Sequence, residues 1–199
     1  MEKKMYMEKR LMMRKRLKYP LFHYYGNVTE NSLLTLSKYF SETPESLHTA
    51  KELRLAQLDP TINNVNSTHV TNYAQHDIQT LKPGSEFIED NFIVVREELQ
   101  GVYEEIAYLL QSPVCRMRYA TIKENDNLVY HIDQPGKDRF VMVIEGVHIV
   151  HIKVKDEIFQ QKMLPGEVWY LNSNWEHKVE NIGTKQRLAL LGCFEYNEK

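Results

Sequence analysis

Cysteine is scarce in this sequence: Cys115 and Cys193 are the only two among 199 residues. Two thiols without a tight motif argue against a disulfide-stapled secreted scaffold and against a cysteine-ligated metal site. Both lie in apolar, strand-like sequence, so we expect them to be reduced residues of the core.

Long hydrophobic runs are also missing. No apolar stretch approaches the roughly 18 residues of a membrane span, and the N-terminus lacks the apolar core, about 7 to 15 residues, of a secretory signal. We therefore expect a cytoplasmic protein with no membrane partner. The chain is 42% hydrophobic and 26% charged, close to the averages for globular proteins, and its length fits a single domain.

The net charge of -2 conceals an uneven distribution. Residues 1–18 hold eight Lys or Arg and two Glu, a balance of +6, which leaves -8 for the remainder. The simplest interpretation of this basic N-terminal extension is a short amphipathic helix that packs on the core or frays. A nucleic-acid or acidic partner is the alternative, but one basic cluster without interleaved aromatics is a weak footprint, so nucleic acid is not expected.

Residues 19–112 are predicted to form helices and loops that pack on a core. Residues 19–26 look extended, 30–41 and 45–55 look helical, and 94–111 carry apolar residues at helical spacing with acidic residues on the other face. Residues 56–90 are rich in polar and turn-forming types, and long irregular stretches are often functional, so we predict that substrate-facing loops lie here. His69 and His76 fall in this region and are predicted to be surface or hydrogen-bonded histidines.

Residues 113–199 change to short strands separated by turns such as Asn125-Asp126-Asn127 and Glu145-Gly146. Eight strands are predicted, over residues 114–122, 128–133, 139–145, 147–154, 157–164, 167–171, 178–181 and 186–194. This arrangement predicts a mainly β fold, a jelly-roll or cupin-like barrel braced by the N-terminal helices, with the catalytic core in 113–199.

Three residues of this region form a candidate metal site. His131 and Asp133 are two apart, so on a strand they face the same way. His177 follows the turn Pro165-Gly166 and an apolar run. Two imidazoles and one carboxylate form the facial triad of non-haem Fe(II) oxygenases, which leaves coordination positions open.

Arg187 lies ten residues after His177. If 181–184 is a hairpin turn, the two residues sit nearly opposite each other on paired strands. A guanidinium there suits a dicarboxylate that chelates the metal at its other end. Arg139 begins the strand after the metal loop and is a second candidate for holding a co-substrate or substrate carboxylate; the alternative is a surface ion pair with Asp138 or Asp133.

The pattern His131-x-Asp133, His177 and Arg187 resembles the Fe(II)/2-oxoglutarate-dependent dioxygenases with a double-stranded β-helix (cupin-type) core. Residues 139–143 and the block from Gly166 to His177 and Asn181 most resemble the aspartyl/asparaginyl β-hydroxylase and small bacterial proline-hydroxylase group. The resemblance covers roughly residues 113–196.

The resemblance implies an oxidoreductase that uses Fe(II), 2-oxoglutarate and dioxygen, releases succinate and carbon dioxide, and hydroxylates an unactivated C–H bond. His131, Asp133 and His177 would bind the iron and Arg187 the far carboxylate of 2-oxoglutarate. The implied substrate is a small molecule or peptide carrying an amino-acid group. A non-oxidative, isomerase-like metal-binding cupin and a non-catalytic binding module are the alternatives, and the sequence does not give the oligomeric state.

Several further residues have two interpretations each. Arg116 and Arg118 point to one face of the first core strand and either line the pocket mouth for substrate or are solvated. Trp175 is a candidate pocket wall. Asn181 is equally suited to capping a turn and to catalysis. His148 and His151 differ in parity, so one should face outwards and the other should be a core or supporting residue, neither being a ligand.

Overall fold

The protein is described by a computed structural model covering residues 18–42, 52–54, 56–57, 94–95, 97–133 and 138–197. Most of the basic segment 1–18, the region 58–93 with His69 and His76, and residues 134–137 lie outside the described residues. The predictions made for them therefore stay predictions.

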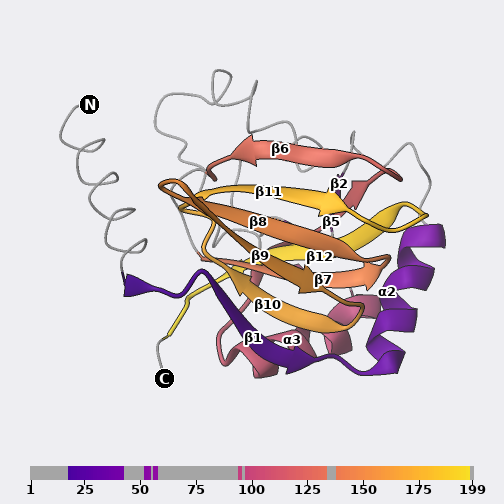
Figure 1. The fold of residues 1–199 in the computed structure, drawn as a ribbon. Coiled ribbons are helices and arrows are strands. Elements are labelled where there is room, and N and C mark those ends of the chain that lie inside the picture. Colours follow the sequence, from indigo (N-terminus) through magenta and orange to yellow (C-terminus); the bar gives the residue numbers. More distant parts are fainter. Residues whose placement is uncertain are drawn as a thin grey trace, which may run out of the picture.

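Two antiparallel sheets facing each other dominate the fold (Figure 1). The larger sheet has the order β1-β10-β7-β12-β5-β2 and the smaller one β6-β11-β8-β9. Their strands are β1 (Phe22–Asn27), β2 (Glu52–Arg54), β5 (Cys115–Ile122), β6 (Asn127–His131), β7 (Asp138–Glu145), β8 (His148–Val154), β9 (Glu157–Met163), β10 (Glu167–Leu171), β11 (Glu176–Asn181) and β12 (Arg187–Phe194). All eight strands predicted after residue 113 are present, with ends within two residues of the expected positions. The fold is the predicted double-stranded β-helix, a mainly β jelly roll.

Apart from the β8–β9 hairpin, the chain alternates between the two sheets as it proceeds through this half. β5, β7, β10 and β12 belong to the larger sheet, and β6, β8, β9 and β11 to the smaller one. β11 therefore pairs with β6 and β8, whereas β12 pairs with β5 and β7. The predicted hairpin between β11 and β12 is wrong, because residues 182–186 carry the chain from one sheet to the other.

The helices cover the outer face of the larger sheet (Figure 1). α2 spans Glu30–Glu42, close to the predicted 30–41, and α3 spans Gln100–Leu110 after the 3-10 turn η5 (Glu97–Leu99). The predicted helix over 94–111 begins too early, because β4 (Val94–Val95) pairs with β3 (Ala56–Gln57). The predicted helix over 45–55 is likewise wrong at its end, where β2 pairs with β5. Within the described residues, no helix has the length and apolar character needed to cross a membrane.

Apolar side chains form two layers, one on each face of the larger sheet. In β7, Phe140 and Met142 belong to the cluster shared with the helices, whereas Val141 and Val143 belong to the cluster between the sheets. This alternation follows from the two-residue period of a strand, and both faces are covered, so β7 is buried up to Ile144. The space between the sheets is thus an enclosed interior in which polar residues need specific partners.

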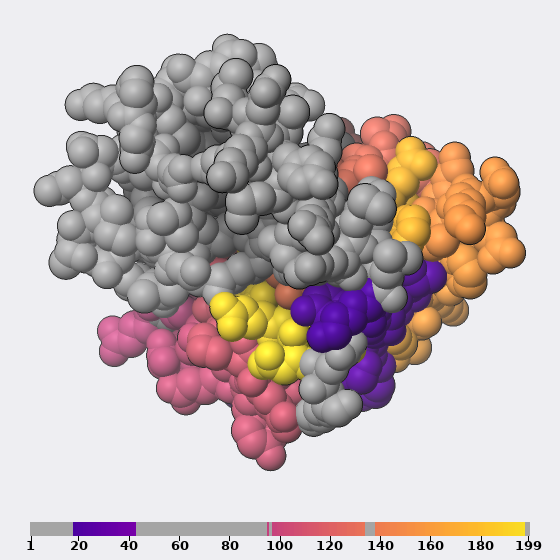
Figure 2. All heavy atoms as spheres, turned by 90° about the vertical axis from the view of Figure 1, so that its left-hand side faces the viewer, coloured from indigo at the N-terminus to yellow at the C-terminus, as the bar shows by residue number. Residues whose placement is uncertain are grey.

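The two ends of the described chain meet on one face. Figure 2 shows the N-terminal part of the described chain, in indigo, beside the C-terminal residues, in yellow. The rings of Tyr19 and Tyr196 lie 4.8 Å apart, centroid to centroid, and Tyr170 of β10 packs on Tyr196 at 4.4 Å. β1 is thereby held along β10 at the edge of the larger sheet.

Candidate metal centre

The three predicted ligands come together at one end of the smaller sheet. His131 ends β6 and lies directly opposite His177 near the start of β11. One donor atom from each of His131, Asp133 and His177 lies within 4.8 Å of the other two. The imidazole centroids of the two histidines are 4.3 Å apart, and Nε2 of His131 is 3.7 Å from Oδ1 of Asp133. A divalent ion fits among donors at these separations.

A backbone carbonyl lies within hydrogen-bond distance of Nδ1 in each of the two imidazole rings. Nδ1 of His131 lies 2.8 Å from the carbonyl oxygen of Val129, and Nδ1 of His177 lies 2.9 Å from that of Trp175. A carbonyl only accepts, so each neutral ring carries its hydrogen on Nδ1 and presents the lone pair of Nε2. Contacts of this kind orient metal-bound histidines. Burial lowers the pKa of His177, which favours the neutral, metal-binding form.

Asp133 lies two residues beyond the end of β6, although the sequence placed it on the strand. Its backbone N–H donates to the carbonyl oxygen of Ser173 at 3.2 Å. Burial by itself raises the pKa of the carboxyl group, but the positive charge of Arg139 leads the opposing contributions, followed by His177 and a hydrogen bond from Ser173. The net pKa lies below the usual value, so the carboxylate is charged and ready to bind a cation. Nothing in the sequence pointed to Ser173.

Arg139 is buried and contacts the carboxylate ligand. Its Nε donates to Oδ2 of Asp133 at 3.3 Å, and Nη1 lies 2.7 Å from Sγ of Cys193. The ion pair with Asp133 exists, but inside the fold rather than on the surface. Cys193 and Cys115 are buried, as expected, and they are directly opposite each other on β12 and β5. Arg139 therefore orients the carboxylate of a candidate ligand, and its expected contact with a co-substrate or substrate carboxylate stays a prediction.

Arg187 begins β12 on the larger sheet, opposite Ile122, rather than on a strand paired with β11. The residue is 2% exposed, and its Nε donates to Nδ1 of His148 at 3.0 Å. Burial lowers the pKa of Arg187 to about 9, and no carboxylate contributes to that shift. Among the described residues, no acidic side chain forms an ion pair with Arg187. A buried cation without a counter-ion is costly, which makes this position suited to an anion.

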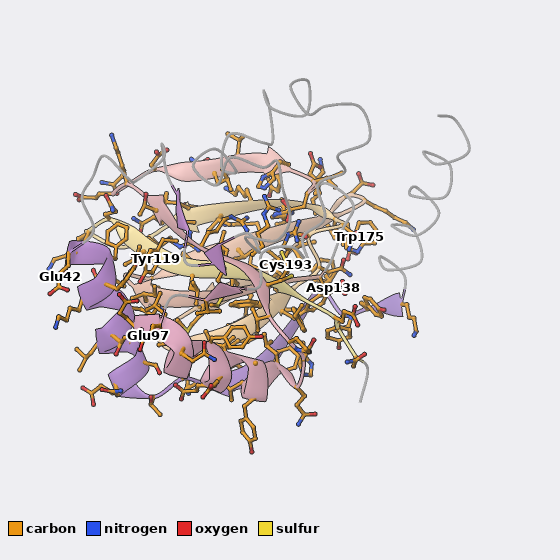
Figure 3. All side chains as sticks on the ribbon, turned by 180° about the vertical axis from the view of Figure 1, so that it is seen from behind. Glu42, Glu97, Tyr119, Asp138, Trp175 and Cys193 are labelled. Carbon is orange, nitrogen blue, oxygen red and sulfur yellow. The ribbon has the colours of Figure 1, made fainter. Side chains whose placement is uncertain are left out.

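The three predicted substrate residues, Arg118, Arg116 and Trp175, occupy different positions relative to the ligand cluster. Arg118 is close enough to Asp133 to contribute to its lowered pKa. Leu191 pairs with Arg118 and Cys193 with Cys115, so Arg116 and Met117 of β5 both lie opposite Gly192 of β12. At this bulge Arg116 has a positive φ of 50°. This bulge interrupts the alternation that was expected to put both arginines on one face. Figure 3 shows Trp175, Asp138 and Cys193 toward the same end of the sheets, and Trp175 packs against the inner apolar cluster.

Two other polar residues have structural partners. Asn181 is buried; its Nδ2 contacts three carbonyl oxygens at 2.8 to 3.2 Å, and its Oδ1 accepts from the N–H of Gly183. It therefore caps the turn that leaves β11. His151 pairs with Glu180 on the outer face of the smaller sheet, whereas His148 faces inwards, so their opposite parity is confirmed.

Comparisons with known proteins give matches to solved structures over part of the chain only. No family model matches this chain, and no curated protein does. Among solved structures, oxalate decarboxylase from Bacillus subtilis at pH 4.6 is similar, with 20% identity, a TM-score of 0.36, and coverage of 40% of this chain. A mutant of the same enzyme gives 19% identity, a TM-score of 0.36 and 42% coverage. The matched part spans only 21% and 22% of those chains.

Proposed function

We propose that this protein is an Fe(II)- and 2-oxoglutarate-dependent oxygenase that hydroxylates an unactivated C–H bond of an amino acid or amino-acid residue. The observation that carries the proposal is the combination, in one enclosed interior, of a two-histidine, one-carboxylate cluster with the buried guanidinium of Arg187.

The ligand cluster fits a divalent ion of the first transition series. Three protein donors that can lie on one face of the ion leave positions open for a chelating acid and for dioxygen. When bound, Fe(II) supplies the redox chemistry by which dioxygen, 2-oxoglutarate and a C–H bond give succinate, carbon dioxide and an alcohol. His131, Asp133 and His177 would hold this ion. Arg139 and Ser173 keep the carboxylate of Asp133 charged and oriented.

Arg187 is the proposed partner of the far carboxylate of 2-oxoglutarate. His177 is opposite Ile152 on β8, and Asn181 is opposite His148, the residue that Arg187 contacts. Four residues of strand separate these levels, or about 13 Å at 3.3 Å per residue. A five-carbon diacid that chelates at one end, together with the reach of a guanidinium side chain, can cover this distance.

The preference for an amino-acid substrate rests on the resemblance and on positive charge near the ligands. Arg118 lies within electrostatic range of Asp133, and Arg116 is on the same strand. A substrate carboxylate would find a guanidinium there without displacing Arg139 from Asp133. Trp175, half-buried beside His177, would form part of the wall that holds the substrate carbon.

The test is anaerobic reconstitution with Fe(II) and 2-oxoglutarate. The expected result is a weak visible charge-transfer band in the parent protein, absent in His131→Ala and weakened in Arg187→Ala. His151→Ala is the matched control, because His151 faces outwards and should leave the band unchanged. Succinate release in air is then screened with amino acids and short peptides. Fully iron-loaded parent protein without a band would refute the proposal and favour a non-oxidative metal-binding cupin.

A further inference from the structure

His148 is a fully buried histidine whose role neither the fold nor the ligand cluster explains. It begins β8 and has 0% exposure. Its Nδ1 accepts a hydrogen bond from Nε of Arg187 at 3.0 Å. Since an arginine only donates, Nδ1 of His148 carries the lone pair, and the ring hydrogen of the neutral imidazole is on Nε2. In the described part of the chain, this Nε2 is buried without a hydrogen-bond partner.

A buried N–H without an acceptor costs about 1 to 3 kcal/mol. Such a group on the inner face of β8, in line with Val150 and Ile152, indicates an acceptor supplied from outside the chain. The adjacent guanidinium of Arg187 is also buried and has no carboxylate partner among the described residues. One carboxylate would satisfy both groups, because its two oxygens offer about four acceptor positions.

We propose that His148 binds the far carboxylate of the co-substrate, with Nε2–H donating to one oxygen while Arg187 pairs with the group. This inference rests on the proposed function and deepens it, because it names a residue that selects 2-oxoglutarate over 2-oxo acids with a single carboxylate. His148 and Arg187 then act as one unit, in which the arginine fixes the histidine tautomer and both present donors.

The surroundings of the dyad match the shape of such an acid. Between the level of His177 and that of His148, the facing residues of β8 and β11 are apolar: Val150 and Ile152 on one strand and Val179 on the other. An acid with polar ends and a methylene middle would place its carbons against these side chains. The polar contacts would then fall at the two ends, at the metal ligands and at His148.

The charge of the dyad is also suited to one carboxylate. Burial lowers the pKa of His148 well below its usual value, and the positive charge of Arg187 lowers it further. The imidazole is therefore neutral, and the pair carries a single positive charge. A monocarboxylic 2-oxo acid would leave both this charge and the Nε2–H uncompensated, which is the kind of mismatch that gives strong discrimination.

Two substitutions separate a contact with the acid from simple support of Arg187. His148→Asn keeps an acceptor close to the position of Nδ1, so it can still receive the hydrogen bond from Arg187, but it loses the donor at Nε2. His148→Gln places an amide N–H near the position of Nε2 and gives up the Nδ1 acceptor. The two variants therefore divide the two functions of the imidazole ring.

The experiment measures affinities by anaerobic calorimetry on Fe(II)-loaded protein, with 2-oxoglutarate and with 2-oxopentanoate, in which a methyl group replaces the far carboxylate. We expect His148→Asn to weaken 2-oxoglutarate binding about 10- to 100-fold, to change 2-oxopentanoate binding little, and to affect 2-oxoglutarate more than His148→Gln does. Melting temperatures establish that both variants are folded.

The outcomes distinguish the two levels of inference. If the parent protein does not bind 2-oxoglutarate, the proposed function fails and this inference fails with it. If the parent binds and Arg187→Ala weakens binding, but His148→Asn binds as the parent does, only the role of His148 is refuted. A greater loss in His148→Gln than in His148→Asn would also refute it, because that order indicates support of Arg187 alone.

Discussion

Arg139 offers a test of whether a buried arginine serves the metal or an organic acid. Its Nε contacts Oδ2 of Asp133 at 3.3 Å and its Nη1 contacts Sγ of Cys193 at 2.7 Å. Burial raises the pKa of Asp133, and the charge of Arg139 is the largest contribution that lowers it. Replacement of Arg139 by Met removes that contribution. A hydrogen bond to a charged group is worth about 1.5 to 3 kcal/mol, so we expect the metal affinity to fall about 10- to 100-fold.

The assay is a Co(II) titration followed by visible absorption, with no organic acid present. The Co(II) affinity of Arg139→Lys should lie between those of the parent and Arg139→Met. A lysine keeps the positive charge but lacks the planar guanidinium that contacts Asp133 and Cys193 together. Lys38→Met is the control: it removes the same charge from an exposed pair with Glu42 on α2. If Arg139→Met binds Co(II) as tightly as the parent and loses only 2-oxo acid affinity, the ligand-orienting role is refuted.

Three further predictions concern stability. Gly192→Ala should lower the melting temperature by about 2 to 12 °C, because the added Cβ would lie 2.3 Å from Cε1 of the buried Phe140 ring. Asn181→Asp should cost more than about 3 kcal/mol in denaturant unfolding, since a carboxylate would face three carbonyl oxygens that now accept from an amide. Between pH 7.5 and 5.5, the parent should lose about 1.4 kcal/mol more stability than His148→Asn.

The sign of the pH effect follows from the lowered pKa of His148. In the unfolded chain, His148 takes up a proton as the pH falls through about 6.5, whereas in the folded chain it does not. The stability that neutral His148 contributes is therefore complete above that pH and is lost below it. Equal pH profiles of stability for the parent and His148→Asn would contradict the assignment.

The control for Gly192→Ala is Gly101→Ala on α3. Nothing lies within 4 Å of the Cβ added at Gly101, so this variant should be stabilised. Asn181→Ala should cost less than Asn181→Asp.

The sequence predicted the strands and the ligand cluster because both depend on local patterns. Continuous apolar runs located β7 and β12, and His131 and His177 could be selected because each lies at one end of a strand-like run. The cluster survived an error in detail, since Asp133 lies just past the strand and is held by the backbone of Ser173 instead. Two ligands on one chain segment remain close whether that segment is a strand or a short extension of one.

Long-range pairing is what the sequence did not supply. A turn at Asn181–Thr184 favours a hairpin locally, and only the alternation between sheets sends β12 to pair with β5 and β7. Val94–Val95 has the spacing of a helix but is paired with a segment almost forty residues earlier. The bulge at Arg116 leaves no local signal either, because its positive φ falls on a residue with a large side chain.

The distribution of charge in the interior links the two ends of the site. Among the described residues, Asp133 is already paired with Arg139, while Arg187 has no acidic partner. A divalent ion on the ligands would add two positive charges beside the single carboxylate of Asp133. A dicarboxylate that chelates the ion and reaches Arg187 neutralises charge at both ends, whereas a monocarboxylate neutralises only one. Metal and diacid should therefore each increase the affinity of the other, because binding coupling is reciprocal. The same reasoning favours a neutral His148. If His148 were protonated, two positive charges would face one carboxylate of the bound acid, and one of them would be left without a counter-ion.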